Sequence, residues 1–235
     1  NVSYNHNEII ELYNGIDEYE RTGSNTKLVV GHSSSEFYIN RYAGVNPANG
    51  DALWLTKDDE LTTEYNEADK VMIGKSFVAP WQGGFGTTIS WNGLSLSSMF
   101  SWVANRWMIN NDRFFEESNG LYSVYNQSRR LLYDRWKKPG DITDIPRYGI
   151  TPQMDSRFLE NASFLRLKNL TLNYTLPASL LKKSKAIERA NVYIQGQNLF
   201  TITDFTGIDP EATGNVYQAQ YPMSRQFTLG LDITF

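Results

Sequence analysis

The sequence contains no cysteine, so disulfide bonds and thiolate metal sites are unavailable to it. No apolar run approaches eighteen residues, which excludes a transmembrane helix. Charged residues make up only 20% of the chain, less than in an ordinary soluble domain, and the net charge of −4 gives no sign of a nucleic-acid surface. We therefore expect no nucleic-acid partner.

Aromatic residues, by contrast, are plentiful: they make up 14% of the chain and include 14 tyrosines and 6 tryptophans. Both of these side chains have an apolar body with a polar tip, which suits a membrane–water interface or a surface that stacks on sugars. A soluble all-β protein is also rich in tyrosine. Composition alone leaves these two classes open.

The last ten residues, 226–235, alternate strictly between apolar side chains and polar or small ones. The apolar members are Phe227, Leu229, Leu231, Ile233 and Phe235. A period of two predicts a strand with one apolar and one polar face. A strand buried in a sandwich would alternate in the same way. The pattern runs to an aromatic final residue, however, which is typical of the strand that closes an outer-membrane β-barrel.

The clearest local signal is Asn92-Gly93, which lies between two further alternating runs. Both residues tolerate the positive φ angles of a type I′ turn, so the stretch predicts a β-hairpin of 83–91 and 94–103. One face of this hairpin is mostly Ser, Thr and Gly, which suits a wet lumen better than a dry core. We expect the other face to meet lipid, at Leu94, Leu96, Phe100 and Trp102.

The complete pattern predicts an all-β fold with six transmembrane strands, at 2–12, 83–91, 94–103, 162–176, 191–203 and 224–235. The connections alternate in length: 13–82, 104–161 and 204–223 are long, whereas 92–93 and 177–190 are short. Long loops of bacterial outer-membrane barrels are extracellular and short turns periplasmic, so the carboxy terminus is expected in the periplasm. Six strands cannot enclose a lumen, so a larger antiparallel barrel is expected. Segments 121–136 and 178–189 have helical tendencies.

The strand predicted at 162–176 has a fault in its alternation, because its apolar residues change from odd to even positions after Leu167. One extra residue reverses the faces of a strand, so a β-bulge near Lys168-Asn169 restores a continuous apolar face. The alternative is that the first half of the strand stands clear of the membrane. In both cases Arg166 and Lys168 are expected in polar surroundings.

Several stretches resemble one family, the SusC/RagA-type TonB-dependent outer-membrane transporters. The resemblance covers nearly the whole chain and is most specific at 157–177, 193–203, 207–211 and 221–235. The second of these stretches reads Tyr-Ile-Gln-Gly-Gln-Asn-Leu-Phe-Thr-Ile-Thr, and the third reads Gly-Ile-Asp-Pro-Glu. Arg135-Trp136 with Pro139-Gly140-Asp141 gives weaker support.

The resemblance implies a 22-stranded barrel in the outer membrane, of which residues 1–235 form the carboxy-terminal part of one domain. An amino-terminal plug, the earlier strands and the segment that engages TonB are then expected outside this chain. Such transporters pair with a SusD-like surface lipoprotein and import oligosaccharides or, in some cases, peptides. A dimer of transporter–lipoprotein pairs is one possible assembly. No cofactor, metal or enzymatic activity is implied.

Five loop aromatics are the candidates for contact with a ligand or with the lipoprotein lid: Trp54, Trp81, Trp107, Tyr125 and Trp136. Their alternative role is packing of the loops against each other. His6 and His32 have no nucleophile pattern nearby, so we expect them to be surface or interface residues. Asp209 and Glu211 flank Pro210 and are expected in a turn, and the acidic stretch 57–69 lacks the glycine and spacing of an EF-hand.

Two rival functions come from other classes. The first is a passive porin or structural barrel, which would need neither plug nor TonB. The second is a soluble carbohydrate-binding β-sandwich, which would stay soluble in water without detergent. An apolar lipid belt on the folded sheet separates the second from a membrane barrel.

Overall fold

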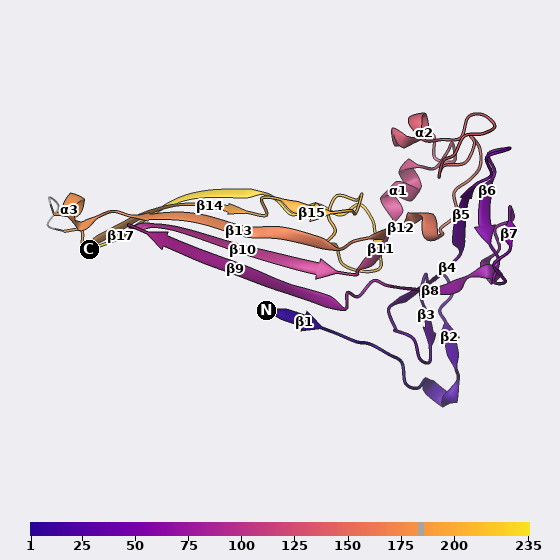
Figure 1. Cartoon of the computed structure of the whole chain (residues 1–235), viewed down its shortest axis with the longest axis horizontal. Helices are drawn as coiled ribbons and strands as arrows, with labels where there is room; N and C mark the ends of the chain where they lie inside the picture. The colour runs from indigo at the N-terminus through magenta and orange to yellow at the C-terminus, as the bar shows by residue number, and fades with distance from the viewer. Residues whose placement is uncertain (183–185) are drawn as a thin grey trace.

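The computed structural model describes residues 1–182 and 186–235, and most of its ordered elements are strands. The main sheet has seven strands, all paired in antiparallel fashion. They are β1 (Val2–Tyr4), β9 (Trp81–Trp91), β10 (Leu94–Ala104), β13 (Phe164–Thr175), β14 (Arg189–Gln197), β15 (Thr201–Thr203) and β17 (Gln226–Thr234). In order along the sheet, β1, β9, β10, β13, β14 and β17 are neighbours, and β15 pairs with β13. Apart from β15, each strand thus lies beside the next one of the sheet along the chain (Figure 1).

The hairpin of β9 and β10 forms where the sequence predicts it. Asn92 and Gly93 have φ angles of 47° and 84°, both in the left-handed region that a tight two-residue turn requires. A side chain at position 93 would also meet the carbonyl oxygen of Thr175 at 2.9 Å. Glycine therefore serves both the backbone angle and the close approach of the neighbouring strand.

The strand register collects the apolar side chains on one face of the main sheet. Cross-strand partners share a face. One row of partners reads Trp91, Leu94, Tyr174, Val192 and Leu231. The adjacent row on the opposite face reads Ser90, Ser95, Asn173, Tyr193 and Gly230. The main sheet is therefore amphipathic from β9 to β17.

The β-bulge expected in the fourth strand is present. Met99 of β10 pairs with Asn169, but the next residue, Phe100, pairs with Leu167, so that Lys168 is the extra residue of β13. Without this extra residue, Leu167 would lie on the polar face. The prediction of a bulge at Lys168-Asn169 is confirmed.

Two predicted strands differ from the observed ones. The first, expected at 2–12, ends at Tyr4 because its partner β9 begins at Trp81, and the last bond of the ladder runs from the Asn5 N–H to the Pro80 carbonyl oxygen at 2.8 Å. The fifth, expected at 191–203, is divided into β14 and β15 by Asn198, whose φ angle is 52°. Alternation extends past Asn198, and in the first strand it breaks only at Glu8-Ile9, beyond the observed end at Tyr4, so the pattern alone could not reveal either interruption.

The two longest connections are folded into small sheets and short helices. The first contains β2 (Glu18–Glu20), β3 (Lys27–Val29), β4 (Glu36–Ile39), β5 (Arg41–Val45), β6 (Ala52–Leu55), β7 (Leu61–Thr62) and β8 (Val71–Ser76), with 3₁₀ turns at Tyr13–Gly15 and Glu67–Asp69. The second contains β11 (Trp107–Asn110), α1 (Asn111–Glu116), α2 (Arg130–Tyr133), a 3₁₀ turn at Ser156–Phe158 and β12 (Leu159–Asn161). The third contains β16 (Val216–Tyr217).

We call residues 5–80, 105–163 and 204–225 the cap. Its elements gather at one end of the main sheet, at the right of Figure 1, whereas α3 (Ala178–Leu181) and the carboxy terminus lie at the other end. Long connections therefore share one end of the sheet, as their alternation in length predicts.

Helices are few and short. The prediction of a helix over 121–136 is wrong except at α2. The stretch before α2 forms turns, in which the Gln127 side chain donates hydrogen bonds to the carbonyl oxygens of Tyr122 and Tyr125. The helical tendency of 178–189 is met by α3, and residues 183–185 of that segment lie outside the described residues. Among the described residues, no helix has the length and apolar character needed to cross a membrane.

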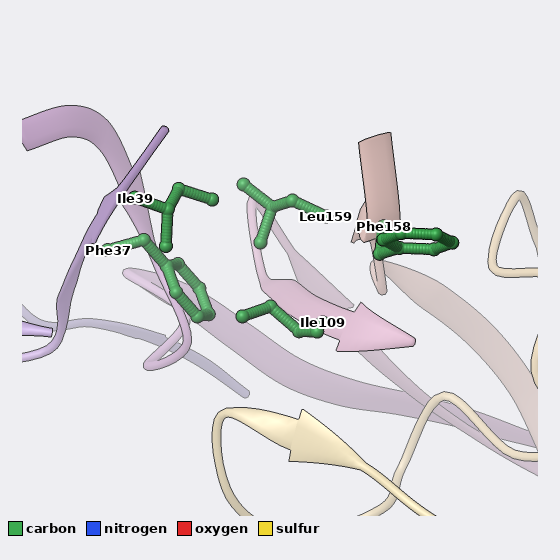
Figure 2. Close-up of a cluster of buried hydrophobic side chains, with 5 residues drawn as sticks. All are labelled: Phe37, Ile39, Ile109, Phe158 and Leu159. Atoms are coloured by element: carbon green, nitrogen blue, oxygen red, sulfur yellow. The ribbon is translucent and has the colours of Figure 1, made fainter. Parts of the chain in front are cut away.

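The cap has its own hydrophobic core, built around β11. One cluster consists of Phe37, Ile39, Ile109, Phe158 and Leu159, which come from both long connections (Figure 2). A second cluster consists of Met108, Ala162, Phe205, Ala212 and Tyr217. Met108 and Ile109 are successive residues of β11 and so point to opposite sides, one into each cluster. Because β11 also pairs with β12 and β16, it joins the second and third connections.

Candidate functional site

A buried ionic network centred on Glu117 holds the cap together. The Glu117 side chain is 1% exposed, and its Oε1 atom accepts hydrogen bonds from Arg113 Nε at 2.9 Å and from Arg130 Nη1. Its other oxygen, Oε2, lies 3.8 Å from Arg157 Nη2. One carboxylate therefore compensates guanidinium groups from three separate segments of the chain.

The same two arginines extend the network to Asp144 and Glu160. Arg113 Nη2 and Arg130 Nη2 donate to Asp144 Oδ2 at 3.2 and 2.6 Å. Arg113 Nη1 donates to Glu160 Oε1 at 3.2 Å, and the Thr206 N–H donates to Glu160 Oε2 at 2.8 Å. Because buried charges are tolerated only when they are paired, these contacts fix α1, α2 and the third connection relative to one another.

A second ionic cluster lies at the β-bulge and involves Arg166, Lys168, Asp209 and Glu211; we call it the bulge clamp. Arg166 donates to Asp209 Oδ1 from Nη2 and to Glu211 Oε2 from Nη1, both at 2.6 Å. Lys168 Nζ donates to the two oxygens of Glu211 at 2.7 and 2.6 Å. Both cations thus lie in polar surroundings, as expected, and they attach the third connection to β13.

Asp209 is held as a carboxylate in this clamp. Burial favours its neutral form, but hydrogen bonds from Arg166 and from the backbone N–H groups of Glu211 and Met223 outweigh burial, so that the pKa of Asp209 is below its usual value. The bulge clamp is therefore ionic at neutral pH.

Arg106, just before β11, attaches the third connection from a different side. Its guanidinium donates to the carbonyl oxygens of Phe77 at 3.2 Å and Pro210 at 3.0 Å, and also to that of Ala212. A planar guanidinium with five N–H donors can satisfy several carbonyl groups in one plane. Arg106 therefore ties the end of β8 to residues 210–212.

Of the five candidate aromatics, Trp54 is buried in the cap and Trp136 is half-buried between two of its loops. Trp54 is 5% exposed, and its Nε1–H donates to Asp155 Oδ2 at 2.7 Å. Burial raises the pKa of Asp155 to about 6 despite this bond. Trp136 packs on Gly50 and donates to the Pro47 carbonyl oxygen at 3.2 Å. Both indoles pack one loop against another, which is the alternative role considered for them.

The other three candidates differ from these two in their surroundings. Trp107 is half-buried on β11 and has Lys75 Nζ 3.0 Å from its ring centroid. Trp81 begins β9 and packs against Tyr4, with ring centroids 4.5 Å apart. Tyr125 is 60% exposed. The structure therefore distributes four of the aromatics over the cap, places Trp81 at the start of β9, and does not bring the five together into one site.

The residues expected to face lipid lie on the apolar face of the main sheet. By strand register and alternation this holds for Leu94, Leu96, Phe100, Trp102, Phe227, Leu229, Leu231 and Ile233. Phe235 follows the end of β17 and is exposed. The apolar face of the main sheet thus extends from the hairpin of β9 and β10 through β13 and β14 to the final strand, β17.

Sequence reasoning missed the ionic partners of the cap. Asp209 and Glu211 were expected only in a turn, whereas they also neutralise Arg166 and Lys168. The sequence did contain a signal: two cations at a break in the alternation of β13 require anions, and the third long connection carries an acidic pair. In the acidic stretch 57–69, Asp59 pairs with Arg41 and Asp69 Oδ1 accepts from the Lys57 N–H at 3.2 Å. Across residues 1–182 and 186–235, no group of three or more His, Asp or Glu side chains is arranged to hold a metal ion.

Curated proteins that match this chain are TonB-dependent receptors. The chain is 26% identical to TonB-dependent receptor P3 and 29% identical to TonB-dependent receptor P26, both of Formosa agariphila, and 26% identical to TonB-dependent receptor SusC of Bacteroides thetaiotaomicron. Each match covers the whole chain and 24–26% of the relative. The chain thus spans about a quarter of the length of these relatives. No family model matches it.

Solved structures of the RagAB peptide importer have the same fold as this chain. The open-open state matches with a TM-score of 0.90 at 41% identity, covering 97% of the chain and 25% of the solved one. A structure of the RagAB peptide transporter matches with a TM-score of 0.91 at 40% identity, covering 99% and 26%. The chain therefore shares its backbone fold with these structures over 97–99% of its length.

Proposed function

We propose that the chain forms part of an outer-membrane importer. The basis is its resemblance to SusC/RagA-type TonB-dependent receptors, which the comparisons confirm over the whole chain. The observation that carries this proposal is the match to the RagAB peptide importer at 40–41% identity over 97–99% of the chain. Relatives of this chain are receptors and transporters and not enzymes, which agrees with a transport role.

The main sheet contributes six strands to the wall of a larger barrel, if β14 and β15 are counted as one, and we propose that this barrel has 22 strands. A closed barrel satisfies every backbone hydrogen bond within the bilayer and presents an apolar band to lipid. The apolar face of β9, β10, β13, β14 and β17 supports this arrangement. Residues 1–235 then belong to one barrel domain of a multi-pass outer-membrane protein, with the cap outside the cell and the carboxy terminus in the periplasm.

The cargo is a peptide or an oligosaccharide, imported with energy delivered through TonB. The structural neighbours at 40–41% identity are named as peptide importers, which favours peptides, whereas SusC stands among the curated relatives at 26% identity. We propose that an amino-terminal part of the protein, outside residues 1–235, makes the contact with TonB.

The partner is a SusD-like surface lipoprotein seated on the cap. Solved structures named RagAB have two components, which supports a paired assembly. The exposed apolar side chains of the second connection offer a surface for it: Val124, Tyr125, Leu132, Tyr133 and Ile142. Aromatic anchors on such a surface supply much of the binding energy of protein interfaces. A dimer of transporter–lipoprotein pairs is compatible with this arrangement.

Uptake by cells tests the proposal. Cells that carry the full-length transporter gene and its partner should accumulate a labelled peptide or oligosaccharide, and deletion of the region encoding residues 1–235 or of TonB should abolish accumulation. Uptake that persists without TonB would identify a passive pore. For the partner surface, Tyr125→Ala with Val124→Ala should reduce co-purification of the lipoprotein, whereas the control Tyr19→Ala, at an exposed tyrosine of β2, should not.

A further inference from the structure

The six tryptophans of the chain form two groups of three. Those of the first group lie in the cap, and each donates its indole N–H to an oxygen atom of the protein at 2.7–3.2 Å. Those of the second group lie on the main sheet and are Trp81, Trp91 and Trp102. Among the described residues, no acceptor takes the indole N–H of this second group. These three donors are therefore left for water or for a partner outside the chain.

The three sheet tryptophans lie on the apolar face. Trp91 pairs with Leu94 at the turn of the hairpin, and Trp81 and Trp102 follow in the same alternation towards its other end. Trp81 and Trp91 thus mark the two ends of β9, which runs along the main sheet from the cap to the opposite end (Figure 1). Between them the apolar face of the hairpin, which the structure describes in full, carries no charged side chain. Amphipathic side chains therefore flank an uncharged band.

At the cap end of this band, aromatic side chains from three adjacent strands gather. The ring centroids of Tyr4 on β1 and Trp81 on β9 are 4.5 Å apart. The indole of Trp102 on β10 lies over Gly83, where an added side chain would meet its ring at 3.0 Å. We call Tyr4, Trp81 and Trp102 the aromatic collar. Directly beyond the collar the chain becomes polar, at residues 5–8 and 105–106.

The length of the band matches the thickness of a membrane. Trp81 and Trp91 are ten positions apart on β9. Ten residues of antiparallel strand extend about 34 Å along the strand. A strand tilted by about 40° in a barrel wall would then place the two tryptophans about 26 Å apart along the membrane normal, close to the apolar band of about 25 Å in outer-membrane barrels.

We propose that the aromatic collar lies among the lipid headgroups of the leaflet nearest to the cap, and that Trp91 lies at the opposite boundary of the bilayer. Tryptophan and tyrosine suit such a boundary, because the ring is apolar whereas its N–H or O–H group needs a polar partner. The inference rests on the proposed import function and assigns Trp81 to lipid, not to cargo or to the lipoprotein lid. Cargo would pass along the polar face, which lines the lumen, whereas the collar lies on the opposite face.

The test places single spin labels on the full-length transporter in phosphatidylcholine vesicles, with and without its lipoprotein. The labelled positions on the apolar face of β9 are Trp81, Phe85, Thr87 and Trp91, with Tyr4 as a second position in the collar. We expect the ratio of oxygen access to nickel-chelate access to be highest at Phe85 and Thr87. It should fall severalfold towards both Trp81 and Trp91, and Tyr4 should give the same ratio as Trp81. The control Tyr19, exposed on β2 of the cap, should be reached mainly by the chelate.

Two results would overturn the inference while leaving the membrane wall intact. A ratio at Trp81 as high as that at Thr87 would move the boundary into the cap. A label at Trp81 that both reagents reach only after the lipoprotein is removed would assign this position to the lid. A third result, a low and uniform ratio at all the labelled positions of β9, would refute the wall itself, and with it both this inference and the proposed import function.

Discussion

Arg166 of β13 and Asp209 of the third connection form a buried ion pair, with 2.6 Å between Arg166 Nη2 and Asp209 Oδ1. The pair spans 43 residues of sequence and attaches the cap to the sheet at the β-bulge. The same guanidinium also holds Glu211. One side chain on a barrel strand thus positions a whole connection.

Replacement of Arg166 should release that connection. Arg166→Met leaves Asp209 buried beside an apolar side chain, and breaking a buried pair in this way costs about 3–5 kcal/mol. We expect faster proteolysis within residues 204–223 of the folded, membrane-embedded protein. Lys168→Met serves as the control, because Lys168 is more exposed and should show a much smaller effect. Equal cleavage of both variants and the wild type would mean that the clamp does not hold the connection.

Replacement of Glu117 should loosen the cap from within. Glu117→Gln removes the charge that compensates Arg113 and Arg130, so the cap should lose about 3–5 kcal/mol of stability. Hydrogen exchange at the amides of α1 and α2 reports this loss. Asp134→Asn breaks only a half-exposed pair with Arg130 and should cost less than about 1 kcal/mol. Unchanged exchange in Glu117→Gln would contradict the account of the network.

The cap should become more stable as the pH falls from 7 to 5. The pKa of Asp155 in the folded protein is raised to about 6, above its value near 3.9 in an unfolded chain, so the folded state binds the proton more tightly. For a carboxyl group whose pKa is raised on folding, stability is lost as the pH rises from about 4 through about 6. Greater protection of the Trp54 indole N–H at pH 5 than at pH 7, measured relative to the intrinsic exchange rate of a free indole at each pH, is the expected result. In Asp155→Asn this dependence should disappear, and its persistence would assign the effect to another group.

A charge on the apolar face of the last strand should be costly. Leu231→Lys should reduce the stability of the barrel by roughly 2–4 kcal/mol if position 231 lies near the bilayer midplane. Thr228→Lys, on the polar face of the same strand, is the control and should be nearly neutral. Denaturant unfolding in lipid vesicles measures both. Similar costs for the two variants would indicate that the two faces do not differ in environment.

The sheet could be predicted from the sequence because its information is local. Alternation gave the faces of β9, β10 and β17, Asn92-Gly93 gave the turn, and the change of parity after Leu167 gave the bulge. Each of these features follows from residues that are adjacent in the chain.

The cap could not be predicted because its stability depends on contacts between distant segments. Phe37 and Phe158 share a core although 121 positions separate them, and neither lies in a long periodic run. Short strands such as β6 and β7 form only when a partner is supplied, so propensity does not show them. The ionic partners of Arg113 and Arg166 likewise come from other connections. The positions of the candidate aromatics in the folded chain depend on the same kind of contact, so the sequence indicates these residues by their type and not by their place.

The most direct test of the central claim, that the main sheet is part of a membrane-spanning wall, is the environment of its two faces. Spin labels placed at Leu231 and at Thr228 of the full-length protein in lipid vesicles report accessibility to oxygen and to a water-soluble nickel chelate. A membrane wall predicts that the label at Leu231 is reached mainly by oxygen and the label at Thr228 mainly by the chelate. The reverse order, or equal access of the chelate to both positions, would contradict a lipid-facing sheet.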